Sequence, residues 1–175
     1  KPIDEGKTDD AVELLKAAEK IDPKNVDVYI MMAQAFLTAK PRRIEEAEQA
    51  AKKGYAVDPK HPTVRFQLGL ALLGGGKLKP SEDLLRGLRR EYPTLRTAPP
   101  PSSADIRKYL GTVFFKEKQY RRAEIEWREG LQLSPDDAVM KKNIEAIWAT
   151  PGVKMSNELN DKGTRALGEK RYDDA

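Results

Sequence analysis

Apolar residues in this chain recur every three or four positions, which is the spacing of one face of an α-helix. The segment 26–61 shows this pattern twice. Its first run consists of Tyr29, Met32, Ala33 and Phe36. A second run begins at Ile44 and ends at Asp58-Pro59, because proline lacks the amide hydrogen that a helix interior needs. The segment is therefore predicted to form two helices joined by a turn.

The two-helix pattern repeats along the chain, and four prolines mark its period. Successive prolines are 36, 34 and 42 residues apart, and a small residue precedes each of them by twelve positions. The four prolines and their small partners are Pro23, Pro59, Pro93 and Pro135, with Ala11, Ala47, Ser81 and Ala123. Because a unit of this size cannot bury its apolar face alone, neighbouring units are expected to stack on one another.

The repeat pattern divides the chain into segments of different kinds. Within 62–103 we expect a surface loop at 94–103, rather than a ligand-contacting lid, since the three prolines 99–101 cannot continue a helix. The segments are 1–25, the second helix of a truncated repeat; 26–61, 62–103 and 104–137, three repeats; 138–150, a capping helix; and 151–175, the start of a further repeat.

The segment 104–137 carries the most specific pattern, and it resembles the tetratricopeptide repeat. The matching residues are Leu110, Gly111, Phe114, Tyr120, Ala123, Trp127, Gly130 and Pro135. The resemblance implies an all-α fold, a right-handed α-solenoid of helix-turn-helix units whose first helices line a concave surface. Four prolines in register disfavour the alternative of a generic helical bundle with coincidental spacing.

Composition narrows the possible functions. Lysine and arginine number 32 against 28 aspartates and glutamates, so the net charge of +4 is too small to indicate a dedicated nucleic-acid binder. Basic residues gather between Arg86 and Arg128, but interleaved glutamates favour a solvated, salt-bridged face over a site for an acidic partner. The chain has no cysteine, which excludes disulfides and cysteine-based metal sites. No apolar run is long enough to be a transmembrane segment.

The sequence offers little for catalysis. His61 is the single histidine and lies beside Pro62, so it has no second histidine or cysteine with which to hold a metal. The carboxylate pairs Glu45-Glu46 and Glu124/Glu126 occupy positions that do not face each other on a helix. The glycines 74–76 are not followed by the Gly-Lys-Ser/Thr of a phosphate-binding loop. We therefore expect no enzyme activity, no metal and no cofactor.

The resemblance implies a partner-binding groove on the first helices. Its expected residues are Ile30, Gln34, Leu37, Phe66, Leu70, Leu73, Lys108, Thr112, Phe115 and Lys142. Six of them form an apolar strip that would fit an amphipathic helix or an extended peptide. The six are Ile30, Leu37, Phe66, Leu70, Leu73 and Phe115. The alternative is that several of these side chains pack against the neighbouring second helix as core.

These observations favour a non-catalytic scaffold that binds a protein or peptide partner. Two alternatives remain at this point: a self-assembling structural protein whose repeats stack head to tail, and a helical accessory segment of a larger enzyme or secretion component. Head-to-tail stacking is expected because apolar faces are predicted to stay uncovered at both ends of the array. The faces are Val12, Leu15 and Ala18 at the start, and Leu159, Ala166 and Leu167 at the finish.

The segment from Met155 also resembles the opening repeat of co-chaperones that clamp the acidic tails of heat-shock chaperones. Those proteins place a lysine and an asparagine around the first-helix glycine. Here the glycine is Gly163, and the two positions hold Asn160 and Thr164. Because Asn160 cannot supply a cation to a terminal carboxylate, we expect no useful affinity for such tails.

Overall fold

The computed structural model describes residues 5–93 and 101–150, and every regular element within these ranges is an α-helix. The helices are α1 (Glu5–Ile21), α2 (Val26–Thr38), α3 (Ile44–Val57), α4 (Pro62–Gly74), α5 (Leu78–Glu91), α6 (Ser103–Lys116), α7 (Tyr120–Leu133) and α8 (Ala138–Ala149). The expected start of a further repeat at 151–175 lies outside the described residues, as do positions 94–100 of the expected loop.

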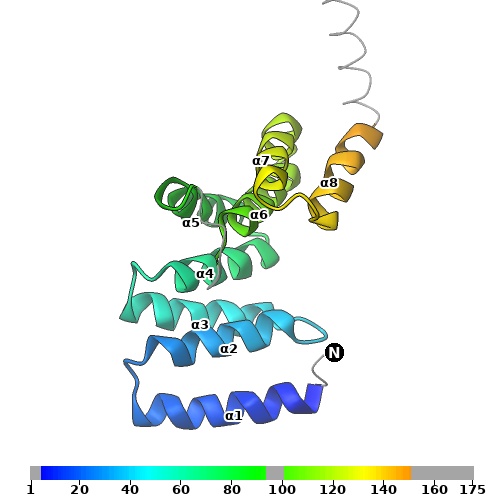
Figure 1. Ribbon diagram of the computed structural model, residues 1–175. Helices are drawn as coiled ribbons and strands as arrows, with labels where there is room; N and C mark the ends of the chain where they lie inside the picture. The colour runs from blue at the N-terminus through cyan, green and yellow to red at the C-terminus, as the bar shows by residue number, and fades with distance from the viewer. Residues whose placement is uncertain (1–4, 94–100, 151–175) are drawn as a thin grey trace, which may run out of the picture.

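The helices pair into antiparallel hairpins that stack in chain order. α2 packs with α3, α4 with α5 and α6 with α7, while α1 and α8 lie at opposite ends of the array (Figure 1). Each first helix also contacts the second helix of the preceding hairpin, so α3 packs on α4 and α5 on α6. The predicted all-α solenoid is confirmed.

The four registered prolines end the second helices. α1, α3, α5 and α7 each stop two residues before their proline. Side chains cap the first helices that follow: Asn25 Oδ1 accepts from the Asp27 amide at 3.1 Å, and Asp137 Oδ1 accepts from the Met140 amide at 2.9 Å. These caps satisfy backbone donors that have no partner inside the helix.

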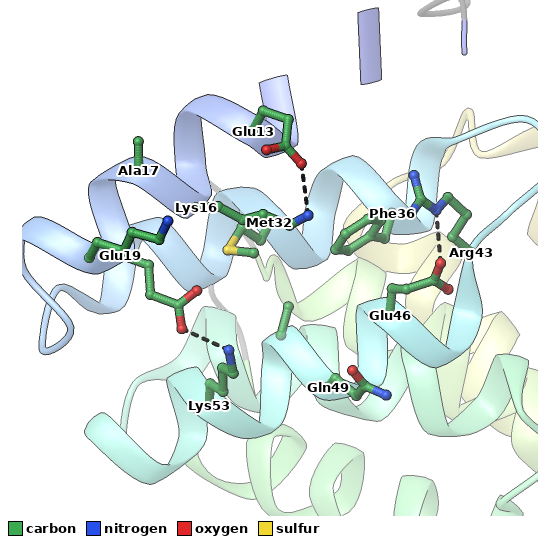
Figure 2. A pocket seen from close by; sticks show the side chains of 12 residues that line it. Glu13, Lys16, Ala17, Glu19, Met32, Phe36, Arg43, Glu46, Gln49 and Lys53 are labelled. Carbon is green, nitrogen blue, oxygen red and sulfur yellow. Dashed lines mark hydrogen bonds and ion pairs between the residues drawn. The ribbon is translucent and has the colours of Figure 1, made fainter. Parts of the chain in front are cut away.

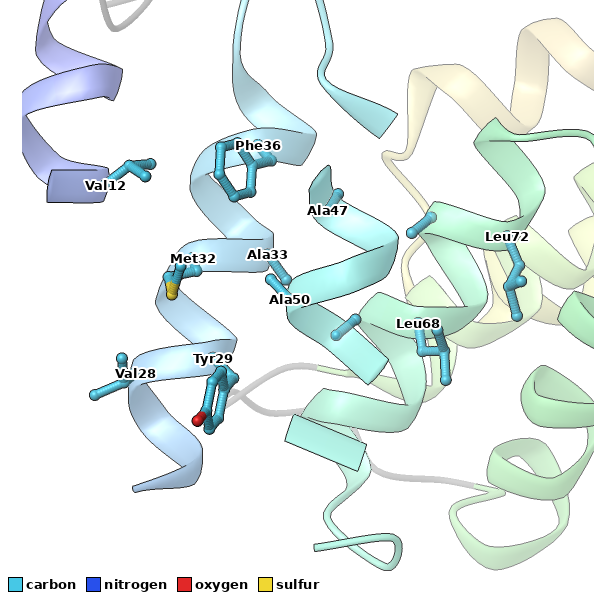
Figure 3. Close-up of a cluster of buried hydrophobic side chains, with 12 residues drawn as sticks. Val12, Val28, Tyr29, Met32, Ala33, Phe36, Ala47, Ala50, Leu68 and Leu72 are labelled. Carbon is cyan, nitrogen blue, oxygen red and sulfur yellow. The ribbon is translucent and has the colours of Figure 1, made fainter. Parts of the chain in front are cut away.

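Two clusters of buried apolar side chains hold the array together. The first joins α1, α2, α3 and α4 through residues that include Val12, Phe36 and Leu68 (Figure 3). The second joins α4 to α8 and centres on Leu85, Leu110 and Trp127. Since the clusters follow each other along the array, each hairpin is stabilised mainly by its neighbours.

The small residues of the repeat mark where paired helices approach most closely. A Cβ atom on Gly111 would lie 2.5 Å from Nε1 of Trp127, so only glycine fits opposite this ring. The same Nε1 donates a hydrogen bond of 2.9 Å to the Lys108 carbonyl. In the preceding hairpin, Ser81 Oγ donates to the Gly69 carbonyl at 2.8 Å. The family's small positions are thus explained by backbone proximity.

Candidate partner-binding groove

An apolar groove of about 640 Å³ lies where α1, α2 and α4 meet. Its apolar wall includes Leu14 of α1, which is 74% exposed, and Met31 of α2, which is 55% exposed. The full lining is Ala11, Leu14, Leu15, Ile30, Met31, Gln34, Ala35, Thr38, Thr63 and Gln67. Two large apolar side chains exposed side by side are costly in water, so a covering partner would stabilise this region.

Helical spacing brings these residues to one place. On α1, Leu14 and Leu15 stand three and four residues after Ala11, and on α2 Ile30, Gln34 and Thr38 follow one another at four-residue steps. The corner at α4 is polar: Gln67 Nε2 donates to Gln34 Oε1 at 3.2 Å. The groove therefore combines an apolar wall with an amide pair at its edge.

One polar atom of the groove is left without a partner. Gln67 is 4% exposed, and no described residue donates a hydrogen bond to its Oε1. A buried acceptor without a donor costs free energy, so this position is a local weak point of the α2–α4 contact.

The ten sequence-predicted residues do not form one site. Ile30 and Gln34 line the groove. Leu37 is half-buried against the first core cluster, and Leu70 and Phe115 are half-buried against the second. Three polar residues lie on α6 and α8, away from the lining: Lys108, Thr112 and Lys142.

The expectation of a continuous open strip is wrong for Phe66 and Leu73. Phe66 is 6% exposed and Leu73 is 7% exposed, and both belong to the second core cluster. The ring of Phe66 packs edge-on against Tyr109, with 5.6 Å between the ring centroids. Tyr109 of α6 covers Phe66, and Leu73 is buried within the same cluster, which helical spacing on α4 alone could not reveal.

The expectation for the start of the array also needs correction. Val12, expected to be uncovered, is 3% exposed within the first core cluster, and Leu15 and Ala18 are half-buried against that cluster. The exposed face of α1 is instead rotated toward Ala11 and Leu14. Leu14 and Met31 were missed because sequence spacing did not show which side of α1 and α2 the neighbouring helices cover. The corresponding expectation for Leu159, Ala166 and Leu167 lies outside the described residues.

The polar candidates on α6 are already engaged in the array. Lys108 Nζ lies 3.0 Å from Asp105 and 3.1 Å from Asp137. Burial acts to lower the pKa of this amine, but its hydrogen bonds to the two carboxylates together raise it. Thr112 Oγ1 donates to the Lys108 carbonyl at 2.9 Å. Lys142 is exposed on α8. Lys108 thus joins α6 to the start of α8 and is poorly placed to bind a partner's carboxylate.

A second groove of about 550 Å³ lies between α1, α2 and α3 (Figure 2). Met32 and Phe36 contribute apolar lining, and charged side chains of both signs surround it. Ion pairs neutralise most of these charges: Lys53 lies 2.7 Å from Glu19, and Arg43 Nε lies 3.0 Å from Glu46. Such a self-neutralised rim offers little charge for recognising a partner.

The basic residues between α5 and α7 are paired in the same way. Glu126 is 3% exposed and bonds to Arg89 and Arg107. Burial raises the pKa of the Glu126 carboxyl, and the two arginines act against that shift. A small cavity of about 220 Å³ beside this cluster is lined by Arg86, Arg89, Phe114, Arg122, Ile125 and Glu126. Arg89 and Arg107 therefore form part of the salt-bridged face that the sequence predicted.

Residues 5–93 and 101–150 contain no group of three histidine, cysteine or acidic side chains that could hold a metal ion. No helix in these same ranges is both long and apolar enough to cross a membrane.

Comparisons with known proteins agree with the repeat architecture. A family model described as tetratricopeptide repeat matches residues 3–42. Comparison with curated protein sequences found no match. Among solved structures, a crystal structure of MamA is 18% identical, with a TM-score of 0.71 over 95% of this chain and 91% of that chain.

Two further structures are similar in fold. MamA from Desulfovibrio magneticus RS-1, solved from residue 41 to its end, is 15% identical, with a TM-score of 0.72 over 97% of this chain and 89% of that chain. YrrB, described as a tetratricopeptide-repeat protein with an unusual peptide-binding site, is 16% identical, with a TM-score of 0.65 over 77% of this chain and 64% of that chain. The registered prolines, the small residues at the helix crossings and the stacked hairpins agree with the tetratricopeptide-repeat match at residues 3–42 and with the fold of these structures.

Proposed function

We propose that this chain is a non-catalytic scaffold that binds a protein partner in the groove between α1, α2 and α4. The observation that carries the proposal is the pair of exposed apolar side chains, Leu14 and Met31, in the wall of that groove. Apolar patches of this kind mark interaction sites on proteins that are otherwise well solvated.

The groove favours an amphipathic helix or an extended peptide as ligand. An apolar face on the ligand would cover Leu14 and Met31. YrrB supports this proposal by analogy, since it is described as having an unusual peptide-binding site in a chain of similar fold. A role as accessory segment of an enzyme has no specific support in the described residues.

The proposal is tested by affinity capture with the 1–175 chain as bait, in three versions. The wild type is compared with Leu14→Glu/Met31→Glu, which charges the groove, and with Val139→Glu. Val139 is a matched control because it is 56% exposed and lies on α8, at the other end of the array. A partner that the groove binds is retained by the wild type and by the control, and lost from the double variant.

Each captured protein is then purified and titrated against the three versions. We expect the double variant to weaken binding at least about tenfold, since each buried aliphatic side chain contributes about that factor. Equal binding by all three versions would place the interaction elsewhere and refute the groove.

A further inference from the structure

The turns inside the hairpins lie next to one another on one edge of the array. Lys77, in the α4–α5 turn, places its Nζ 2.6 Å from Oε1 of Glu48, in the second turn of α3. Arg122, in the first turn of α7, lies 3.6 Å from Glu82, in the second turn of α5. The α2–α3, α4–α5 and α6–α7 turns therefore form one continuous surface.

Positive charge is in excess on this edge. In residues 35–47, 71–81 and 113–123, which span the three turns and the adjoining ends of the helices, five cations form no ion pair with any described residue. Two carboxylates there, Glu45 and Glu117, form none either. The five cations are all exposed, and we call them the basic edge: Lys40, Arg42, Lys116, Lys118 and Arg121.

The opposite edge has no such excess. In residues 18–29, 54–65 and 130–141, which span turns between hairpins, cations and carboxylates without an ion pair to the described part of the chain are equal in number. Arg90, at the end of α5, adds one cation near this edge. The cations are Lys20, Lys24, Lys60 and Lys141, and the carboxylates are Asp22, Asp27, Asp58 and Asp136. Of the two edges, only the basic edge carries a clear surplus of unpaired positive charge.

Lys118 is held at the tip of its turn in a backbone conformation that favours glycine. Its φ is 61°, and the residue at the same place in the preceding hairpin is Gly76, with a φ of 75°. The two turns are built alike, since the amides of Gly76 and Lys118 each donate to the carbonyl three residues earlier. A side chain is disfavoured in this left-handed region. A lysine that is kept there is a pointer to function rather than to folding.

We propose that the basic edge binds an acidic segment of a partner protein. This surface is separate from the groove between α1, α2 and α4, because none of the five cations lines that groove. Exposed cations without partners attract a chain of carboxylates, and the amino ends of α3, α5 and α7, which lie on the same edge, add positive potential.

The spacing of the turns suits an extended segment. Two first-helix steps of about 8–10 Å each separate the α2–α3 turn from the α6–α7 turn, so about five to six extended residues reach from one to the other. Lys77 and Lys79 lie between the two groups of unpaired cations. Both are ion-paired, but 52% and 67% of their side chains remain exposed along the path of such a segment.

The shape and composition of the edge favour a flexible acidic chain over other polyanions. Figure 1 shows α7 turned steeply relative to α3, so successive turns rotate along the array and do not present their cations to one flat lipid surface. Single-stranded nucleic acids bind largely by stacking bases on aromatic rings. In residues 35–47, 71–81 and 113–123 every aromatic ring is buried or half-buried. A protein segment rich in aspartate and glutamate needs neither a plane nor a stacking ring.

Fluorescence anisotropy at low ionic strength tests the proposal. The probe is a labelled peptide of about twelve residues that alternates glutamate with serine and is blocked at both ends. The 1–175 chain is compared with Lys116→Ser/Lys118→Ser/Arg121→Ser and with Lys24→Ser/Lys60→Ser/Lys141→Ser. The second variant is a matched control, because it removes three exposed, unpaired cations from the opposite edge and changes the net charge equally.

We expect the basic-edge variant to weaken peptide binding about fivefold or more, and the control to stay within about twofold of wild type. Added salt should weaken the binding further, since the cations are exposed. Equal weakening by the two variants would assign the binding to overall charge and overturn the proposal. A wild-type chain that does not bind the peptide at low ionic strength overturns it as well.

Lys118→Gly separates the role of the charge from that of the fold. Glycine suits a φ of 61°, so thermal denaturation should show a stability equal to or above that of wild type. The same variant should bind the peptide about two- to fivefold more weakly. Lower stability with unchanged peptide binding would show that Lys118 serves the turn and not a ligand.

Two further probes distinguish the classes of polyanion. Vesicles with about one-third phosphatidylserine in phosphatidylcholine, and a single-stranded oligothymidylate, are titrated with the same three versions of the chain. We expect both to bind more weakly than the peptide at equal concentrations of negative charge. Tighter binding of either one, lost in the basic-edge variant, would overturn the acidic segment in favour of a lipid surface or a nucleic acid.

Discussion

At the scale of single residues, the backbone of α6 at Gly111 lies closely against the indole of Trp127 on α7. The ring is 1% exposed, and its nitrogen bonds to the Lys108 carbonyl. Because Gly111 has no side chain, Trp127, the largest buried side chain in the described ranges, can pack directly against the backbone of α6.

Replacing Gly111 with alanine should destabilise the protein, although alanine normally favours a helix by about 1 kcal/mol over glycine. The added Cβ would lie 2.5 Å from Trp127 Nε1, so the ring or the helix must move. We expect a loss of about 1–3 kcal/mol in the free energy of unfolding, measured by urea denaturation. Gly69→Ala is the matched control, since its Cβ would lie 3.3 Å from Leu85 and should cost less. Equal stability of Gly111→Ala and wild type would contradict the contact.

Phe66 and Ile30 occupy equivalent positions, 36 residues apart, and should respond differently to truncation. Phe66 is 6% exposed in the core, so Phe66→Ala should cost about 3–5 kcal/mol of the free energy of unfolding. Ile30 is half-buried in the groove wall, and Ile30→Ala should cost less than about 2 kcal/mol. Thermal and urea denaturation of both variants measure this difference, and a larger loss for Ile30→Ala would show that the burial is misassigned.

Phe66 and Ile30 also show how much of the structure the sequence could predict. Helical periodicity and the registered prolines predicted the helices, their pairing and the small residues at the crossings, because these depend on local spacing. They also placed Ile30 and Gln34 on the face that lines the groove. They could not separate Ile30 from Phe66, since that difference depends on whether a later helix, α6, brings Tyr109 over the ring.

At the scale of helices, ion pairs join elements that are far apart in the sequence. Lys53 of α3 lies 2.7 Å from Glu19 of α1. Glu48 of α3 lies 2.7 Å from Lys52 and 2.6 Å from Lys77, which stands just before α5. Glu48 is 7% exposed, so its pairs are better shielded from solvent than those on the outer surface.

These partners give the Glu48 pairs a definite pH dependence. Hydrogen bonds from Lys52 and Lys77 hold the pKa of the Glu48 carboxyl below its ordinary value. Since the folded pKa is the lower one, this stability is present above the unfolded pKa, near 4.3, and is lost as the pH falls through the folded pKa. The difference in free energy of unfolding between wild type and Glu48→Gln should therefore shrink between about pH 5 and pH 3. Denaturation at several pH values measures it, and a constant difference would contradict the assignment.

At the scale of the whole molecule, stability should fall toward the two ends of the described array. The terminal helices pack chiefly on one neighbour each, α1 on α2 and α8 on α7, while α4 packs on α2, α3, α5 and α6. In a stacked array each unit depends on the interfaces with its neighbours, so helices with fewer interfaces open more easily.

Amide hydrogen exchange followed by mass spectrometry should show this gradient directly. Amides of α1 and α8 should exchange faster than those of α4 and α6. Uniform protection along a monomeric chain would mean that the array opens only as a whole.

Because Trp127 is buried between α6 and α7, its fluorescence reports whether this hairpin is folded. The chain has two tryptophans, and the other, Trp148, is 44% exposed on α8. In a Trp148→Phe variant all indole emission comes from the α6–α7 crossing, whereas circular dichroism averages every helix. Unfolding curves from the two signals should separate if the hairpins melt in sequence, and should coincide if the array melts in one cooperative step. Fluorescence of Trp127 therefore measures the stability of the α6–α7 hairpin, whereas circular dichroism measures the stability of the whole array.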